Sequence, residues 1–408
     1  MLRKVLLISG IIVGILAIIL AIALPAEAKA DSLTNIERLG KMLFLDKSLS
    51  FYNNESCATC HAAEFGFTGP NGKINAAGAV YPGSIPGAFG NRKPPTAAYG
   101  GESPVLYYND DDEVWTGGMF WDGRATGWTL GDPLAEQAQG PFLNPAEQAL
   151  PDAEEVCWKV YKSQYAKLFV QVWGELDCDT DLGIALAYDN IGYSISAYEK
   201  SYEVNPFSSK FDGFWDNAKA AGMDVTAIDM SNYTDYYKLG LNNKEVLGLA
   251  IFNDEDKGKC SLCHTLDEGE AGYPLFTDFT YDNLGVPKNL MNPVYTVDPD
   301  FIDLGLGGFL ESAGYPDFMD EYGKFKVPTL RNVDKREGNT VKAYGHNGYF
   351  KSLYEITHFY NTRDVEDWPD PEYADTVNMD ELGDLGLTTA EEKLIVLFMQ
   401  TLTDVTHP

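Results

Sequence analysis

Two short segments of the sequence combine cysteine and histidine at a spacing that can hold a redox cofactor. Residues Cys57–His61 read Cys-Ala-Thr-Cys-His, and residues Cys260–His264 read Cys-Ser-Leu-Cys-His. Two thiols three positions apart can each add across a vinyl group of one haem, and the histidine that follows can then reach the iron. We therefore predict two covalently attached haem c groups, bound through Cys57, Cys60, Cys260 and Cys263, with His61 and His264 as iron ligands.

Zinc sites and dithiol redox sites also use Cys-x-x-Cys, so a zinc site and a disulfide are the alternatives to haem. A tetrahedral zinc site would need a second pair of cysteines close by, and neither segment has such a pair in the neighbouring sequence. The two segments use four of the six cysteines and two of the five histidines. The duplicated pattern therefore favours haem over zinc or a disulfide.

The second axial position on each iron separates electron transfer from catalysis. A haem with two protein ligands can only pass electrons, whereas a haem with an open side can bind peroxide. The next histidine after His61 is His264, and Met119 is the sole methionine in the hundred residues that follow His61. We therefore expect the first haem to be open. The second haem has several candidate ligands, and sequence spacing does not choose among them: His346, His358, Tyr360, Met379 and Met399.

A helix is predicted before each haem segment. The sequence Leu-Gly-x-x-x-Phe occurs at Leu39–Phe44 and again at Leu247–Phe252, which indicates an internal duplication. Thr34 and Glu37 have the spacing of a capping box at the start of the first helix. The second helix is expected over residues 243–253.

Further helices are predicted where apolar residues recur every three or four positions, over residues 154–174 and 181–203. A last capped helix is expected to open with Thr389 and Glu392. Residues 62–120 and 265–345 are rich in Gly, Pro, Asn and Asp and are predicted to form long ordered loops around a site. The expected fold is mainly α, with two cytochrome c-like haem domains over residues 32–235 and 236–408.

Composition restricts the partners. The 408 residues are 45% hydrophobic and 13% aromatic, enough for a substantial core. The 61 acidic and 30 basic residues give a net charge of −31, which repels nucleic acid and anionic lipid surfaces. The charge suits a cationic soluble partner, although solubility alone also explains it.

The N-terminus has the pattern of an export signal. Two basic residues precede an apolar stretch from Val5 to Leu24 and small residues up to Ala30. Residues 1–28 are therefore predicted to be a signal peptide cleaved near Ala28, or an uncleaved membrane anchor, because the stretch is long enough to span a bilayer. The remainder is expected in the periplasm. In that oxidising compartment Cys157 and Cys178 are predicted to form a structural disulfide, with free buried thiols as the alternative.

Beyond the haem segments, the sequence resembles the bacterial di-haem cytochrome c peroxidase and MauG family over nearly all of residues 36–403. The segments that carry the resemblance are Phe120–Arg124, Glu136–Ala138, Gly140–Glu147, Phe325–Val333 and His346–Gly348. The resemblance implies that the N-terminal haem binds peroxide and that Glu147 acts as acid and base on it. It also implies that Gln137 lines the same pocket, that Trp121 carries electrons between the haems, and that Arg124, Arg331 and His346 contact the haems.

Two positions depart from the classical peroxidases. Those enzymes place a blocking histidine sixteen residues after the first haem histidine, where this chain has Ala77. They also place a methionine ligand for the second haem where this chain has Tyr360. MauG-type members use tyrosine there, and a phenolate ligand stabilises higher oxidation states of iron. His358 is the rival, but residues 358 and 360 point about 200° apart on a helix, so only one can face the iron.

The family also implies a calcium ion between the haems and often a homodimer. An asparagine before a Pro-Thr segment is expected to bind the calcium, but Lys93 stands at that position, and Asn91 is the substitute. The predicted function is reduction of hydrogen peroxide with electrons from a small cytochrome c or cupredoxin. One alternative is a MauG-like enzyme that uses a high-valent di-haem state to oxidise an aromatic residue of a partner protein. The other is a di-haem electron-transfer cytochrome without enzymatic activity.

Overall fold

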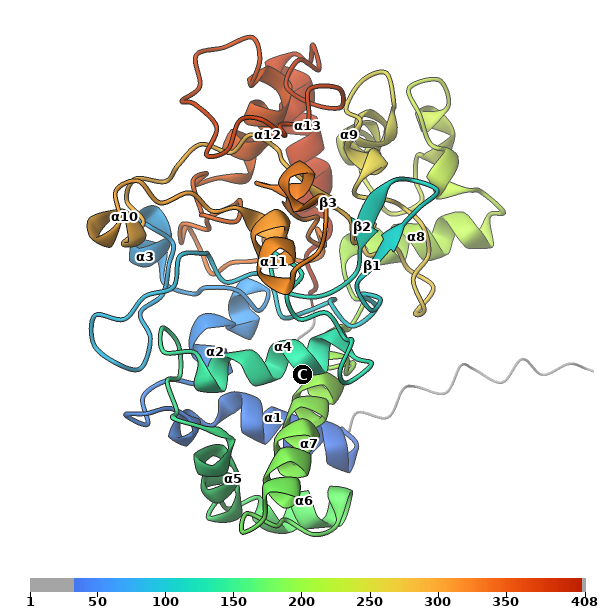
Figure 1. Ribbon diagram of the computed structural model, residues 1–408. Helices are drawn as coiled ribbons and strands as arrows, with labels where there is room; N and C mark the ends of the chain where they lie inside the picture. The colour runs from blue at the N-terminus through green and yellow to red at the C-terminus, as the bar shows by residue number, and fades with distance from the viewer. Residues whose placement is uncertain (1–32, 406–408) are drawn as a thin grey trace, which may run out of the picture. The chain divides into compact units, whose positions relative to one another are not determined.

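The computed structural model describes residues 33–405, which are mainly helical with a few short strands, as the sequence predicts. Figure 1 shows α1, α2 and α4 to α7 in one part of this body and α8, α9, α12 and α13 in another. The helices are α1 Asn35–Leu45, α2 Cys57–Cys60, α3 Gly72–Ala76, α4 Pro133–Leu143, α5 Ala153–Tyr161, α6 Ala166–Trp173, α7 Asp181–Glu199, α8 Lys210–Ala220, α9 Asn243–Asn253, α10 Val294–Val297, α11 Gly305–Ala313, α12 Leu353–Thr362 and α13 Thr389–Gln400.

Two antiparallel strand pairs lie in the long loops between the helices. Strand β1 Tyr107–Asn109 pairs with β2 Val114–Thr116, and β3 Tyr281–Asp282 pairs with β4 Phe325–Lys326. An isolated bridge between Thr116 and Thr280 connects the two pairs. The predicted loops are therefore ordered, and they bring the N-terminal third of the chain against its C-terminal third.

The predicted signal peptide or anchor, residues 1–28, lies outside the described residues. Between residues 33 and 405, none of the helices is long and apolar enough to cross a membrane.

Helix α1 begins as predicted, because Thr34 and Glu37 form a capping box. Its Gly40 lies against α7 so closely that an added Cβ would be 1.8 Å from the backbone oxygen of Ser194. A larger residue at position 40 would therefore force the two helices apart. The small residue fixes the crossing of α1 and α7.

The second helix pair repeats this crossing. Helix α9 covers the predicted residues, and an added Cβ on its Gly248 would be 2.0 Å from the backbone oxygen of Leu394 in α13. The predicted cap of α13 is wrong by one residue, because Thr388 and Glu391 form the capping box. Glu392 is instead buried and accepts a hydrogen bond from the hydroxyl of Tyr354 in α12.

The two predicted helices between the crossings are shorter than expected. Residues 154–174 form α5 and α6, because the chain leaves the helical path around Tyr165, whose hydroxyl donates to Asp46 over 2.6 Å. Helix α7 ends at Glu199, so the predicted helix over 181–203 is four residues too long.

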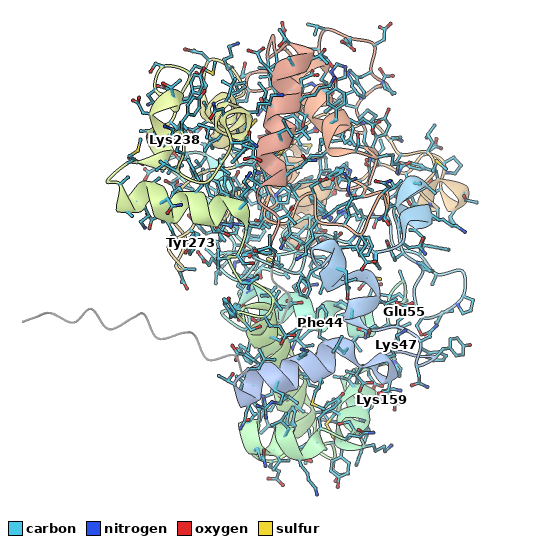
Figure 2. All side chains as sticks on the ribbon, turned by 180° about the vertical axis from the view of Figure 1, so that it is seen from behind. Phe44, Lys47, Glu55, Lys159, Lys238 and Tyr273 are labelled. Atoms are coloured by element: carbon cyan, nitrogen blue, oxygen red, sulfur yellow. A yellow bond between two sulfur atoms is a disulfide. The ribbon has the colours of Figure 1, made fainter. Side chains whose placement is uncertain are left out.

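A large core lies around α8, α9 and α13 and is rich in aromatic residues. Phe211 and Trp215 of α8 pack there with Phe398 of α13. Figure 2 shows Phe44 on α1 and, in the other part of the body, Tyr273 beside α8. The chain from Thr34 onward forms one compact unit by its contacts, and the division at residues 235 and 236 stays a prediction.

Candidate functional site

The two haem-segment histidines are held in the same way. Nδ1 of His61 lies 3.1 Å from the backbone oxygen of Phe67, and Nδ1 of His264 lies 2.9 Å from the backbone oxygen of Phe276. Both phenylalanines have a left-handed backbone with φ of 55°. A carbonyl that accepts from Nδ1–H fixes the tautomer in which Nε2 is free to bind a metal.

A second layer of hydrogen bonds repeats around each histidine. The Thr68 hydroxyl donates to the Pro94 carbonyl over 2.8 Å, and the Thr277 hydroxyl donates to the Val327 carbonyl over 2.7 Å. The reverse contacts are also duplicated: Thr96 donates to Gly66 O and Thr329 donates to Leu275 O. A Phe-Thr segment and a Pro-Thr segment therefore hold each other beside each histidine, which we call the first and second haem seats.

Burial keeps both imidazoles neutral. It lowers the pKa of His61 to about 4, against backbone hydrogen bonds with Phe67 and Pro95 that raise it, and it also lowers the pKa of His264. Neutral imidazole is the form that binds iron. The donor set of both seats therefore fits haem iron.

A large cavity adjoins the second haem seat. Cys260, Cys263 and His264 line it, together with apolar side chains such as Leu353 and Ile356. A ring bound to both thiols would lie in this cavity between the histidine and α12. The mostly apolar lining fits a haem.

Only some of the candidate ligands of the second haem line this cavity. Tyr360, His346 and Met399 line it. Met379 is 63% exposed. His358 does not line it, and its two ring nitrogens instead lie 2.8 Å from Glu392 and 3.3 Å from Glu366. Tyr360 therefore faces the haem space, while His358 is occupied by carboxylates.

Trp121 lies between the two haem seats and lines the same cavity. Its indole Nε1 donates to the backbone oxygen of Lys93 over 2.8 Å. The backbone N–H of Lys326 donates to the backbone oxygen of Trp121 over 2.9 Å. Each of these lysines begins the Pro-Thr segment of one seat, so Trp121 is clamped to both.

An ion-pair cluster supports this clamp. The Arg92 guanidinium pairs with Asp122 and with Asp303, each at 2.6 Å, and Asp122 also pairs with Arg124 at 2.8 Å. The pKa of the Asp122 carboxyl is lowered overall. Burial acts to raise it, but the positive charges of Arg92 and Arg124 outweigh the effect of burial.

The residues expected near a calcium ion are already engaged. Asn91, the predicted substitute ligand, donates its amide to Asp303 over 3.0 Å. Within residues 33–405, no three or more His, Cys, Asp or Glu side chains gather to hold a metal ion.

Glu147 lies in the turn after α4, near the first haem seat. The Asn144 amide donates to Glu147 Oε1 over 3.1 Å. Burial raises the pKa of Glu147, and nearby Arg124 partly opposes this. The pKa values of the Cys57 and Cys60 thiols are raised, mainly by burial. The negative charge of Glu147 raises both pKa values further. The structure therefore brings Glu147 close to the first haem attachment.

The other predicted contacts differ in their surroundings. Gln137 lies on α4, is half-buried, and makes no side-chain hydrogen bond within the described part of the chain. Arg331 lines the cavity, but its guanidinium already pairs with Asp212 at 2.6 Å. His346 stacks on Phe325 with ring centroids 3.5 Å apart.

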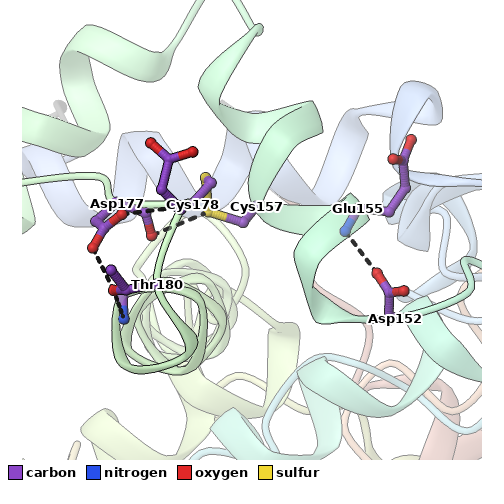
Figure 3. The surroundings of a disulfide bond; sticks show 8 residues. Asp152, Glu155, Cys157, Asp177, Cys178 and Thr180 are labelled. Carbon is purple, nitrogen blue, oxygen red and sulfur yellow. Dashed lines mark hydrogen bonds between the residues drawn. A yellow bond between two sulfur atoms is a disulfide. The ribbon is translucent and has the colours of Figure 1, made fainter.

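The cysteines divide as predicted. Cys157 and Cys178 form a disulfide with Cα atoms 5.8 Å apart, which ties α5 to the segment before α7 (Figure 3). Within the described part of the chain, the four cysteines of the haem segments form no disulfide: Cys57, Cys60, Cys260 and Cys263.

Two lysines and one glutamate were not singled out as site residues from the sequence. Lys93 and Lys326 begin the segments Lys-Pro-Pro-Thr and Lys-Val-Pro-Thr, a second repeat that could have revealed them. Glu199 is buried near Cys57, and its Oε2 has no hydrogen-bond partner. Glu199 directly follows Tyr198, which lies against Gly40 in the first helix crossing. Met399 has the equivalent position in the second crossing, because it directly follows Phe398, which lies against Gly248.

The chain is similar to known proteins. A family model described as di-haem cytochrome c peroxidase matches residues 34–220. The methylamine utilization protein MauG of Paracoccus denitrificans is 32% identical over 94% of each chain. The cytochrome c551 peroxidase of Nitrosomonas europaea is 27% identical over 76% of this chain and 69% of its own. The crystal structure of the diheme peroxidase BthA from Burkholderia thailandensis superposes with a TM-score of 0.72 and 28% identity, over 92% of this chain and 87% of its own.

Proposed function

The chain belongs to the di-haem cytochrome c peroxidase and MauG family, and from this premise we propose that it reduces hydrogen peroxide in the periplasm with electrons from a small soluble donor. It is an oxidoreductase, and the family implies two haem c groups. We therefore do not propose a non-enzymatic electron-transfer cytochrome.

Glu147 supports a peroxide site at the first haem seat, and this is the observation on which the proposal rests. When bound, the haems supply the centres that accept peroxide and hold oxidising equivalents. Glu147 takes a proton from one peroxide oxygen and returns it to the other. The Asn144 amide orients the carboxylate, and burial raises its pKa toward the range useful for an acid and base. Gln137 on α4 supplies a polar side chain to the same pocket.

Trp121 provides the route between the two haem seats. Its hydrogen bonds to Lys93 and Lys326 fix the indole relative to both seats. Electrons from the donor enter at the second seat and pass through Trp121 to the first. His264 and Tyr360, which line the same cavity, would hold the iron of the second haem, and His346, Arg331 and Arg124 would contact the haems.

The donor is a small cytochrome c or cupredoxin with a basic surface. The net charge of −31 favours association with such a cation. Export to the periplasm, with or without a retained anchor, and assembly into a homodimer stay predictions from the sequence. A calcium ion between the haems likewise stays a prediction from the resemblance.

A second candidate function is the oxidation of an aromatic side chain in a specific partner protein. Similarity to MauG over 94% of the chain favours it. Tyr360 in the cavity and Ala77 in place of a blocking histidine favour it as well, because both suit an enzyme that stores oxidising equivalents without prior reduction.

Stopped-flow absorbance separates the two. Peroxide is added to the purified, fully oxidised holoprotein without reductant. A rapid change to a species that decays within seconds once a small cytochrome c or cupredoxin is added, with catalytic turnover, supports the peroxidase. A species that persists in the presence of such donors and decays only with a partner protein supports the second function. Absence of any change until one haem is reduced contradicts the open first haem and indicates a classical peroxidase cycle.

A further inference from the structure

Two lysines occupy equivalent positions beside the two haem seats. Lys93 stands two residues before Pro95 and begins the Pro-Thr segment of the first haem seat, and Lys326 stands two residues before Pro328 and begins the Pro-Thr segment of the second. The internal duplication therefore places one ammonium beside each seat, with Trp121 between the two lysine backbones.

Neither ammonium has a carboxylate partner. Within residues 33–405, no ion pair to Lys93 or Lys326 is formed at 4.0 Å or less; Asp278 acts on Lys326 only from farther away. Both side chains line the cavity, which reaches both haem seats, because Thr68 of the first seat and Thr329 of the second line it as well. Burial lowers the pKa of Lys93 to about 8 and that of Lys326 to about 7, against a smaller opposing effect of Asp278 on Lys326.

Each ammonium also has a hydrogen-bond donor left over. Lys93 Nζ donates to the Thr68 hydroxyl over 3.3 Å and to the Pro94 carbonyl over 3.0 Å. Lys326 Nζ donates to the carbonyls of Gly117 and Phe279 over 2.9 Å and 3.2 Å. An ammonium has three donors, so one donor of each lysine lacks an acceptor in the described part of the chain.

A third lysine of the same cavity shows the contrasting case. Lys342 is 5% exposed, and its Nζ donates to three backbone carbonyls, which uses all its donors. Lys342 is therefore satisfied by the protein alone, whereas Lys93 and Lys326 are not.

A buried cation is costly unless an anion or enough acceptors compensate it. The missing partner must be anionic, must reach the cavity, and must occur twice because the lysines are duplicated. We propose that Lys93 and Lys326 form a paired anion site, in which each ammonium binds a propionate carboxylate of the haem in its own seat. The site then encloses Trp121 between two ammonium–carboxylate pairs. This inference depends on the two haem groups and not on the identity of the oxidised substrate.

The test uses the holoprotein and the midpoint potentials of both haems, measured by spectroelectrochemistry. A positive charge next to a haem carboxylate favours the reduced iron, so its removal favours the oxidised iron. We expect Lys326→Met to lower the reduction equilibrium constant of the second haem about tenfold, which is about 59 mV for one electron. Lys93→Met should lower the midpoint potential of the first haem by a similar amount. Lys93→Arg and Lys326→Arg keep the positive charge, so their potentials should stay close to those of the wild type.

Lys351 provides a matched control. Its Nζ also donates to two backbone carbonyls, those of Ala77 and Gly348, but it does not line the cavity. Lys351→Met should leave both potentials unchanged. Unchanged potentials in Lys93→Met and Lys326→Met, with only a lower thermal midpoint, would show that these lysines merely bind backbone carbonyls and would overturn the proposal.

Two further measurements keep the proposal falsifiable if a methionine variant does not fold. Resonance Raman of the wild-type holoprotein should show propionate bending bands at frequencies typical of strong hydrogen bonding, and bands typical of solvated propionates would contradict it. Addition of inorganic phosphate should not move the wild-type potentials; a phosphate-dependent shift would indicate that the lysines bind an anion from solution instead. If the wild-type holoprotein showed no peroxide turnover while the lysine variants shifted the potentials as expected, the proposed function would be contradicted and this inference would stand.

Discussion

The indole Nε1 of Trp121 donates to the backbone oxygen of Lys93 over 2.8 Å. The bond joins the loop that carries Trp121 to the Pro-Thr segment of the first haem seat. Because the Trp121 backbone oxygen also accepts from Lys326, one residue ties both haem seats together. Any displacement of one seat therefore acts on the other through Trp121.

Replacement of Trp121 should uncouple the two haems. In Trp121→Phe the hydrogen bond to Lys93 is lost and the electron route is weakened. We expect electron transfer between the haems to slow by at least about tenfold, or about 1.4 kcal/mol of barrier. Trp128→Phe is the control, because the Trp128 indole makes the same type of bond, to Leu106, but is 45% exposed. Equal rates in both variants, measured by flash reduction of one haem, would contradict the role.

Loss of the Glu147 carboxylate should impair peroxide cleavage. Glu147→Gln keeps the size and the contact with Asn144, so we expect normal haem content and a decrease in kcat of about 100-fold or more. Glu154→Gln, at an exposed position, should have no effect. Comparable turnover of Glu147→Gln and the wild type would exclude acid–base work by this residue.

The same carboxylate should set the acid limit of activity. A general base must be ionised in the free enzyme, and burial raises the pKa of Glu147 above the range of an exposed glutamate. Activity should therefore fall as the pH decreases through this raised pKa, and recover above it. The measurement is the pH profile of kcat/KM, and the acid limb should disappear in Glu147→Gln.

Tyr360 and His358 give opposite expectations as ligands of the second haem. Tyr360→Met should change the absorbance and electron paramagnetic resonance of the second haem and raise its reduction potential, because methionine is a weaker donor than phenolate. His358→Asn should leave both spectra unchanged, because His358 is bound to Glu392 and Glu366. The reverse pattern would identify His358 as the ligand.

The disulfide should contribute to stability and not to the chemistry. The double replacement of Cys157 and Cys178 by serine opens a loop whose closure is worth about 3 kcal/mol of unfolding free energy. We expect a lower thermal midpoint with normal haem spectra. A change in the haem spectra at low temperature would show that the link also shapes the first haem seat.

Calcium removal should have little effect. Arg92 already pairs with both Asp122 and Asp303, and the Asn91 amide donates to Asp303. Treatment of the holoprotein with a calcium chelator should therefore leave turnover and both haem spectra unchanged. Loss of activity that calcium restores would show that a resident ion is present.

The sequence by itself determined the local parts of this protein. The thiols and the histidine of each haem segment lie within five consecutive residues, so their spacing alone defines the attachment geometry. The capping box of Thr34 and Glu37 and the helix over residues 243–253 were predictable for the same reason, since their hydrogen bonds span three or four residues.

Ambiguity arose wherever two local patterns were equally good. Thr388 and Thr389 each have a glutamate three residues later, and only tertiary packing decided the cap. Glu392 is buried against α12, where it binds Tyr354 and His358, so Glu391 is left to form the capping box. This contact also directs His358 away from the cavity that Tyr360 lines.

Only the tertiary structure decided how the two haem seats meet. Trp121 contacts Lys93 and Lys326, which are far from each other in the sequence, because long loops fold back between the two helix crossings. No periodicity relates such residues, and their contact depends on the packing of the whole body. Local sequence specified the two haem segments, and long-range backbone hydrogen bonds joined them into one site.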